Sequence, residues 1–274
     1  MPDIQLGANV IEPSEAAGRI TAARAILFDW DGCLANGEVL LPGAREVLQS
    51  VSNRSYILSN NSTSHPGDLA SILERAGIEL SAYNILLAGH QTLIEQAIRL
   101  PGRPIHLIAA PQMIAFATTL GISLDQEGAE TMVILRDTGF TFEALTRAVN
   151  AARSCRKIIL SNQDLTHPGP GNMLQPETGA LFAAIQACLG DHAPAVEVVG
   201  KPSPGLFRIA LQRAGIDAAD AVMIGDNPAT DGAGAAACGI PFIQVHPTGP
   251  LTMARLAEAL PAQSAPEQQF GLPL

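Results

Sequence analysis

Short apolar runs alternate along the chain with longer segments of mixed polarity. The runs cover residues 25–28, 56–58, 85–88, 105–109, 132–135, 158–160, 196–199, 221–224 and 242–245. Each run has the length of a strand that is buried on both faces, and the segments between the runs are long enough for helices. Strands that alternate with helices predict an α/β fold with a largely parallel sheet.

An x-Gly-Ile pattern ends four of the segments between the runs, at Gly77, Gly121, Gly215 and Gly239. Many helices end in this way, with a glycine in the left-handed conformation and a following apolar residue that folds back onto the last turn. We therefore expect a helix to end at each of these four positions, which supports the alternation of helices and strands.

Two proline-containing stretches, 100–104 and 191–194, indicate that the strands belong to two domains instead of one barrel. We expect an α/β domain at 101–194 to be inserted into a parallel-sheet core. The core would be made of two pieces of chain, residues 1–100 and 195–274.

The bulk composition excludes several classes of protein. Hydrophobic residues make up 47% of the 274 residues and charged residues 15%, which is enough for a well-filled core. The net charge of −10 argues against a general nucleic-acid binder. Without a signal peptide, a membrane span or paired cysteine motifs, we expect a cytoplasmic protein with reduced thiols and a loosely ordered tail after about residue 260.

Two carboxylates, Asp29 and Asp31, stand one residue apart directly after the first apolar run and are followed by glycine. Open α/β sheets bind their ligands at the carboxyl ends of the strands. Two carboxylates this close raise the pKa of one of them unless a cation lies between them. We therefore expect a proton or a metal here, although this motif alone also fits solvated acids in a turn.

Two further polar motifs follow apolar runs. Ser59, Asn60 and Asn61 come after the second run and could hydrogen-bond an oxyanion, or could form an ordinary turn or helix cap. Lys201, one of two lysines in the chain, comes after the seventh run. Its compact charge suits a phosphate or a carboxylate, and the alternative is a solvated loop lysine.

The eighth run ends in a further acidic motif, in which Asp226 is followed five residues later by Asp231. Oxygen ligands gathered at one point select hard cations such as Mg²⁺. The next segment, 232–237, fits a dinucleotide-binding glycine pattern, but it lies within a predicted helix instead of directly after a strand. We expect its small residues to let the helix pack closely on the sheet and do not predict nucleotide binding.

Taken in order, these four motifs resemble those of the haloacid dehalogenase superfamily of phosphohydrolases. The insertion of roughly 140 residues between the second and third motifs resembles the NagD-like and p-nitrophenylphosphatase-like subfamily. The resemblance implies a Rossmann-like parallel-sheet core with a large α/β cap domain. It also implies an Mg²⁺-dependent phosphatase whose partner is a small phosphorylated metabolite, such as a sugar phosphate, glycerol phosphate, phosphoglycolate or pyridoxal phosphate. Homodimers occur among similar proteins.

Carried over to this chain, the resemblance implies that Asp29 is the nucleophile and forms an aspartyl-phosphate. Asp31 would protonate the leaving oxygen and later activate water. Asp29, the backbone carbonyl of Asp31 and Asp226 would hold the metal. Asp231 would either bind the metal directly or orient its waters and Lys201.

The same resemblance assigns the groups that bind substrate. Ser59, Asn60 and Lys201 would bind the phosphoryl oxygens. Within the insertion, the segment around Asp164 and His167 resembles the subfamily's Asn-x-Asp substrate loop, so these two residues would contact the leaving group. The segment Glu177-Thr178 stands where the usual pattern is richer in glycine, which leaves the substrate open.

Other activities of this fold stay open to different degrees. A phosphotransferase shares the whole first half-reaction. A metal-free dehalogenase is disfavoured by the pair Asp31 and Asp226. A phosphonatase would need a cap lysine, and the candidate, Lys157, precedes a predicted strand. A catalytically silent binding protein is disfavoured because every acid of the four motifs is present.

Overall fold

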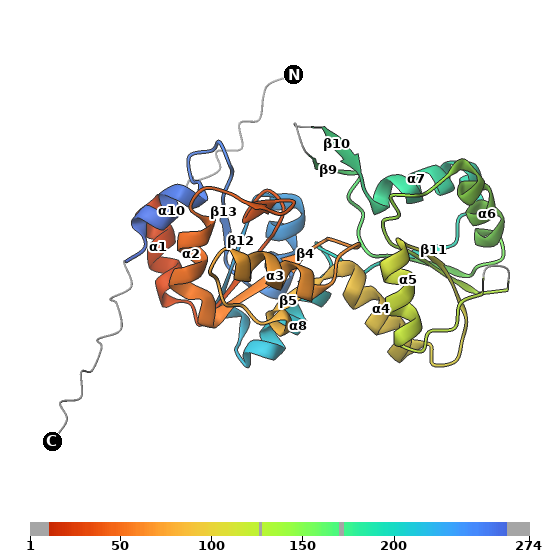
Figure 1. The fold of residues 1–274 in the computed structure, drawn as a ribbon, viewed down its shortest axis with the longest axis horizontal. Coiled ribbons are helices and arrows are strands. Elements are labelled where there is room, and N and C mark those ends of the chain that lie inside the picture. The colour runs from red at the N-terminus through yellow and green to blue at the C-terminus, as the bar shows by residue number, and fades with distance from the viewer. Residues whose placement is uncertain (1–10, 126–127, 170–172, 262–274) are drawn as a thin grey trace.

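The computed structural model describes residues 11–125, 128–169 and 173–261. Within these residues the chain forms two lobes, each built on a parallel sheet, which lie side by side in Figure 1. The first, which we call the core lobe, contains a sheet with the strand order β13 (Phe242–Gln244), β12 (Ala221–Gly225), β1 (Ala25–Phe28), β4 (Ser55–Ser59) and β5 (Ile85–Leu87). All pairs of neighbouring strands in this sheet are parallel.

Helices cover both faces of the core sheet. One face packs on α1 (Pro13–Ala22), α2 (Ala44–Val51), α3 (Pro66–Arg75) and α10 (Met253–Ala259). The other face packs on α8 (Gly205–Ala214) and α9 (Ala233–Cys238). In β1, Ile26 and Phe28 join the first hydrophobic cluster, whereas Ala25 and Leu27 join the second. Alternate residues of a strand point to opposite faces, so a strand covered on both sides must be apolar throughout.

The second lobe, which we call the inserted lobe, has its own parallel sheet. Its strand order is β11 (Ala195–Val198), β8 (Lys157–Leu160), β7 (Thr131–Ile134) and β6 (Ile105–Ile108). Its hydrophobic clusters involve α4 (Ala88–Arg99) and α5 (Pro111–Thr119) on one face, and α6 (Phe142–Ala152) and α7 (Thr178–Leu189) on the other. In Figure 1, α4 lies at the junction of the two lobes.

Two short antiparallel hairpins extend from the lobes. The first pairs β2 (Ala35–Asn36) with β3 (Val39–Leu40), and the second pairs β9 (Thr166–Pro168) with β10 (Leu174–Pro176). The remaining short elements are 3₁₀ turns at Ser52–Arg54, Ala82–Asn84, Gly190–His192 and Ala218–Asp220, and a π-helical turn at Pro228–Gly232. The β9–β10 hairpin projects from the inserted lobe in Figure 1.

The expected strands and helix ends are confirmed. Each of the nine apolar runs contains a strand, and the α/β class with a parallel core sheet is as predicted. Gly77, Gly121, Gly215 and Gly239 all have φ between +64° and +73°. In each case the following isoleucine donates its N–H to a carbonyl in the preceding helix, at 2.9–3.3 Å, which is the bond expected of this helix ending.

One expected boundary is displaced. The sequence places residues 195–198 in the core, but β11 pairs with β8 and therefore completes the inserted sheet. The inserted region thus runs to Val198 in the structure. Hydrogen bonding to a neighbouring strand decides this membership, and the apolar run itself does not encode which sheet it joins. The division into two independent domains stays a proposal.

The small residues of α9 pack on the core sheet, as expected, and also on a neighbouring helix. A Cβ atom on Gly234 would lie 2.3 Å from the Phe207 ring of α8, so the close approach is to a neighbouring helix as well as to the sheet-facing cluster of Ala235. In the described part of the chain, no helix is long and apolar enough to cross a bilayer. The expected tail after residue 260 lies, from residue 262 on, outside the described residues. The cytoplasmic location, the homodimer and the absence of nucleic-acid binding stay predictions.

Candidate active site

The predicted site residues meet at the carboxyl ends of neighbouring core strands. Asp29 follows β1, Ser59 ends β4 and Asp226 follows β12, and these strands are adjacent in the sheet. A cavity of about 300 Å³ lies above them. Its lining includes eight of the nine predicted residues: Asp29, Asp31, Ser59, Asn60, Asp164, His167, Lys201 and Asp226. The ninth, Asp231, is fully buried beneath the cavity.

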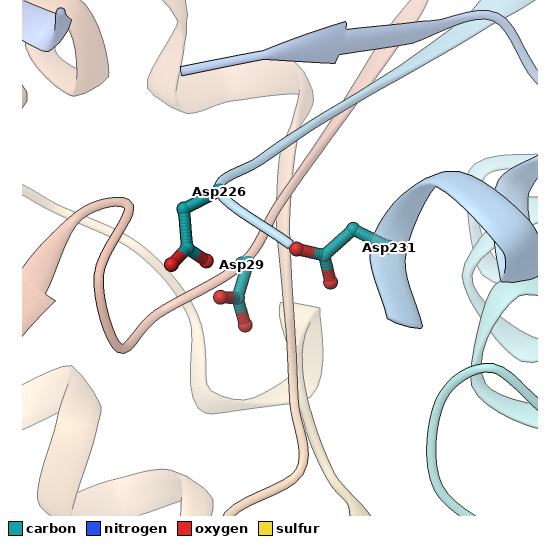
Figure 2. Close-up of side chains that lie close together, drawn as sticks. All are labelled: Asp29, Asp226 and Asp231. Carbon is teal, nitrogen blue, oxygen red and sulfur yellow. The ribbon is translucent and has the colours of Figure 1, made fainter. Parts of the chain in front are cut away.

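Three carboxylates converge at the floor of this cavity. Oxygen atoms of Asp29, Asp226 and Asp231 lie within 4.8 Å of one another, and Figure 2 shows the three side chains pointing toward a common centre. Lys201 lies between two of them, with Nζ 2.5 Å from Asp29 Oδ1 and 2.6 Å from Asp231 Oδ1. One ammonium is therefore in direct contact with two of the three carboxylates, and both of these are buried.

The charges in this cluster perturb one another strongly. Burial raises the pKa of Asp29 well above its usual value, the neighbouring Asp231 raises it further, and Lys201 opposes both effects. Burial alone would lower the pKa of Lys201, but Asp231 and Asp29 together raise it, so the ammonium stays charged. Burial and Asp231 also raise the pKa of Asp226. Carboxylates that resist ionisation in this way are expected where positive charge is too scarce.

A divalent cation fits this donor set. The clustered ligand atoms are carboxylate oxygens, which hard cations prefer, and an added positive charge would offset the mutual repulsion of Asp29, Asp226 and Asp231. Gly32, at φ +86°, lets the main chain pass close to this point, because a Cβ atom there would lie 2.4 Å from Asp226 Oδ2. Any side chain at this position would therefore displace a candidate ligand.

Asp31 lines the cavity but stands apart from the three clustered carboxylates. Its Oδ1 accepts a hydrogen bond from the backbone N–H of Gly37 at 3.3 Å. Burial raises the pKa of Asp31, an effect that this hydrogen bond only partly offsets. A carboxyl whose pKa is raised holds its proton nearer to neutrality, which is what a general acid needs.

Asn60 does not offer its side chain to a ligand as expected. Its Nδ2 donates to Asp164 Oδ2 at 2.9 Å and to the Lys201 carbonyl at 3.1 Å, and its Oδ1 accepts from the Lys201 N–H at 2.8 Å. Both amide protons and the oxygen are therefore used within the protein. The side chain joins the core lobe, the inserted lobe and the backbone of Lys201, so a phosphate contact from Asn60 would have to come from its main chain.

Asp164 takes part in the same contact between the two lobes. The sequence predicts that it contacts the leaving group, and it does line the cavity, but its carboxylate accepts from Asn60. Gly200 permits this close meeting of the lobes, because a Cβ there would lie 2.5 Å from both Asn60 Oδ1 and the Ser161 carbonyl. Asp164 therefore positions Asn60 and, through it, the backbone of Lys201.

Asp164→Ala is expected to lower kcat/KM about tenfold on aryl phosphates and natural phosphate esters alike, because it removes a hydrogen bond to a charged group that helps to place Lys201. His167→Ala, which removes a side chain of the cavity wall, is expected to change discrimination among natural esters more than hydrolysis of p-nitrophenyl phosphate. Steady-state kinetics on both classes of substrate check this. An Asp164→Ala effect confined to natural esters would show that Asp164 contacts the leaving group instead.

Two charged residues of the cavity wall have no role in the sequence-based assignment. Arg136, just after β7, and Glu177, which caps α7, both line the cavity from the inserted lobe. Arg136 Nε lies 3.6 Å from Glu177 Oε1, and His167 Nδ1 lies 2.8 Å from the same oxygen. Glu177 gives a signal in the sequence, since the segment Glu177-Thr178 stands where the usual pattern is richer in glycine, whereas Arg136 belongs to no motif.

Comparison with known proteins agrees with the motifs and the fold. The chain is 29% identical over 215 residues to a dihydroxyacetone phosphatase of Corynebacterium glutamicum, which covers 77% of each protein. It is 31% identical to rat chronophin over 76% of this chain and 72% of chronophin. A p-nitrophenyl phosphatase from Archaeoglobus fulgidus superimposes with a TM-score of 0.76 at 25% identity, which covers 87% of this chain and 99% of that one.

The family assignment rests on more than these individual relatives. A sequence model that describes haloacid dehalogenase-like hydrolases matches residues 23–239, a span that contains all four motifs and the whole inserted lobe. The resemblance seen in the sequence is thereby confirmed. The chain belongs to the haloacid dehalogenase-like hydrolase family.

Proposed function

We propose that this hydrolase is a phosphatase for small phosphate monoesters and that it depends on Mg²⁺. The observation that carries the proposal is the buried cluster in which Lys201 lies between Asp29 and Asp231, beside Asp226, at the floor of the cavity. The names of similar proteins, among them a dihydroxyacetone phosphatase and a p-nitrophenyl phosphatase, support a small phosphorylated substrate.

In the first half-reaction, a carboxylate oxygen of Asp29 attacks phosphorus and the bond from phosphorus to the ester oxygen breaks. Lys201 holds Asp29 in place and offers its charge to the phosphoryl group. The hydroxyl of Ser59, which accepts from the Asn61 N–H at 3.1 Å, still has its proton to donate to a phosphoryl oxygen. Asp31 gives a proton to the departing alkoxide.

In the second half-reaction, water attacks the phosphorus of the aspartyl-phosphate and Asp31 accepts its proton, which restores Asp29 and releases phosphate. Asp29, Asp226 and the backbone carbonyl of Asp31 are the groups that we assign to Mg²⁺, with Asp231 holding Lys201 from below. The cation, when bound, screens the repulsion between the attacking carboxylate and the phosphate.

Removal of the metal is expected to abolish turnover. Wild-type hydrolysis of p-nitrophenyl phosphate should stop in excess chelator and return on addition of Mg²⁺. Asp226→Ala should raise the Mg²⁺ concentration needed for half-maximal activity at least about tenfold, or abolish activity, because it removes both a ligand and charge balance. The control is Asp220→Ala, which changes an exposed carboxylate paired with Arg24. Full wild-type activity in excess chelator would contradict the metal assignment.

A phosphotransferase would pass the same phosphoryl group to another alcohol. Product analysis in the presence of competing alcohols separates the two activities, because a phosphatase releases one inorganic phosphate for each ester cleaved. A second phosphate ester among the products would identify a transferase.

A further inference from the structure

The wall of the cavity that faces the catalytic carboxylates belongs to the inserted lobe. Its charged residues are Arg136, Asp164 and Glu177, with His167 beside them. The proposed chemistry at phosphorus uses none of Arg136, His167 and Glu177. Because the phosphoryl group is held at the core, this wall is the surface that the alcohol part of the substrate must meet.

Arg136 lines the cavity, and its positive charge is already paired with the carboxylate of Glu177. Its Nε donates to the Pro176 carbonyl at 2.9 Å and lies 3.6 Å from Glu177 Oε1. The side chain is 17% exposed, so this ion pair is largely shielded from solvent. A guanidinium that is paired in this way is a poor site for a second anion, because that anion would compete with a carboxylate that is fixed in the protein.

Glu177 is held on several sides while it faces the cavity. Its Oε2 accepts from the Thr178 N–H at 3.2 Å, and its Oε1 lies close to both Arg136 and His167. The residue is 8% exposed, and burial raises the pKa of Glu177 to about 7, although Arg136 opposes the shift. The other charged groups that act on it are Asp164 on the same wall and Asp31 across the cavity, and both contribute to this raised pKa.

The charges of this wall disfavour an anionic leaving group. With Glu177 ionised, two carboxylates face one guanidinium, and the wall carries a net negative charge. A carboxylate or second phosphate on the substrate would meet like charges in a partly desolvated space. A hydroxyl group both donates and accepts hydrogen bonds, so it matches a wall that has carboxylate acceptors beside a guanidinium group.

We propose that the leaving group is a neutral alcohol with further hydroxyls, such as a polyol or a sugar, and that Glu177 selects it against leaving groups that carry a carboxylate or a second phosphate. This inference rests on the proposed phosphatase activity and narrows its substrate class. Glu177 acts here on specificity, and it takes no part in the attack on phosphorus.

A matched pair of substrates tests the inference. Glycerol 3-phosphate and 3-phosphoglycerate share a carbon skeleton, and they differ by a carboxylate in place of a hydroxymethyl group. The wild type is expected to favour glycerol 3-phosphate by about tenfold or more in kcat/KM at pH 8, and Glu177→Gln to bring the ratio below about threefold. Measurable hydrolysis of p-nitrophenyl phosphate by the variant shows that it is folded and active. The control is Glu143→Gln, an exposed glutamate of α6 paired with Arg147, which should leave the ratio unchanged.

The pH dependence of the same ratio tests the wild type directly. As pH falls from 8 to 6, Glu177 takes up a proton, the wall loses its net negative charge, and the preference for glycerol 3-phosphate should decrease. Titration of the shared phosphate and of the catalytic acids affects both substrates and cancels in the ratio. In Glu177→Gln the ratio should be independent of pH.

Two results would overturn the inference. One is a wild-type preference for 3-phosphoglycerate, which would make Arg136 the binding site of the second anion. The other is a ratio that is independent of pH in the wild type and unchanged by Glu177→Gln. Neither result would contradict the proposed phosphatase activity. That activity would fail separately if the wild type hydrolysed neither substrate nor p-nitrophenyl phosphate in the presence of Mg²⁺.

Discussion

Asp29→Asn is expected to abolish both turnover and the phosphoenzyme, because a neutral amide is a poor nucleophile. The substitution preserves the shape of the side chain, and Lys201 keeps its second carboxylate partner, Asp231, at 2.6 Å. The fold should therefore survive, which circular dichroism and thermal unfolding check. The loss of activity should be at least about a thousandfold, as is usual when a covalent nucleophile is removed.

Asp31→Asn is expected to have the opposite effect on the phosphoenzyme. A p-nitrophenolate leaving group needs little protonation, so phosphorylation of Asp29 should continue, whereas the attack of water lacks its base. The intermediate should then accumulate. Rapid quenching should show a burst of p-nitrophenol and a labelled protein adduct at Asp29 that survives denaturation and is cleaved by hydroxylamine.

The pair of variants distinguishes a covalent from a direct mechanism. Inversion of configuration at a chiral phosphorus in the wild type, with no adduct in either variant, would mean that water attacks the ester directly. Asp29 would then lose its role as nucleophile. Retention of configuration together with an adduct in Asp31→Asn would instead support the division of labour between the two carboxylates.

Lys201→Ala is expected to lower kcat/KM by about a thousandfold or more, because it removes the charge that holds Asp29 and that we propose to bind the phosphoryl group. It should also destabilise the fold by about 3–5 kcal/mol, since it leaves two buried carboxylates without their cation. Lys201→Arg should also lose activity. Lys201 is 2% exposed and its Nζ already touches both carboxylates, so a planar guanidinium has no room.

The other lysine provides a matched control. Lys157 lies on β8 and pairs with Glu197 of the neighbouring β11, with its side chain 40% exposed. Lys157→Arg should leave activity and stability close to wild type, because an exposed ion pair contributes little. Activity of Lys201→Arg near the wild-type level would show that the pocket around Lys201 admits a larger cation, and would remove Lys201 from the phosphate site.

Much of the fold and of the floor of the cavity follows from local sequence. A strand covered on both faces must be apolar at every position, so the strands are visible as runs such as 25–28, and their polar ends mark one edge of the sheet. This rule is enough to place Asp29, Ser59 and Asp226 together, because β1, β4 and β12 are parallel neighbours whose carboxyl ends lie at the same edge. Lys201 follows β11, which belongs to the inserted sheet, so its place between Asp29 and Asp231 does not follow from this rule.

What the sequence does not reveal depends on contacts between segments far apart in the chain. The side chain of Asn60 could equally face a phosphate, and only its meeting with Asp164 and Lys201 shows that it joins the lobes. Arg136 and Glu177 become neighbours because the end of β7 packs beside the segment that follows β10. No periodicity or motif specifies that approach.

The pairing of β11 has a consequence for protein engineering. Enzymes of modular build are often altered by exchanging one lobe between homologues. A chimera cut at residue 194, where the prolines suggest a boundary, would force β11 of the recipient to pair with β8 of the donor. A cut after Val198 keeps the inserted sheet whole and leaves Lys201 with the recipient. The fusion point then falls at Val199 and Gly200, where the absence of a side chain on Gly200 has to be kept.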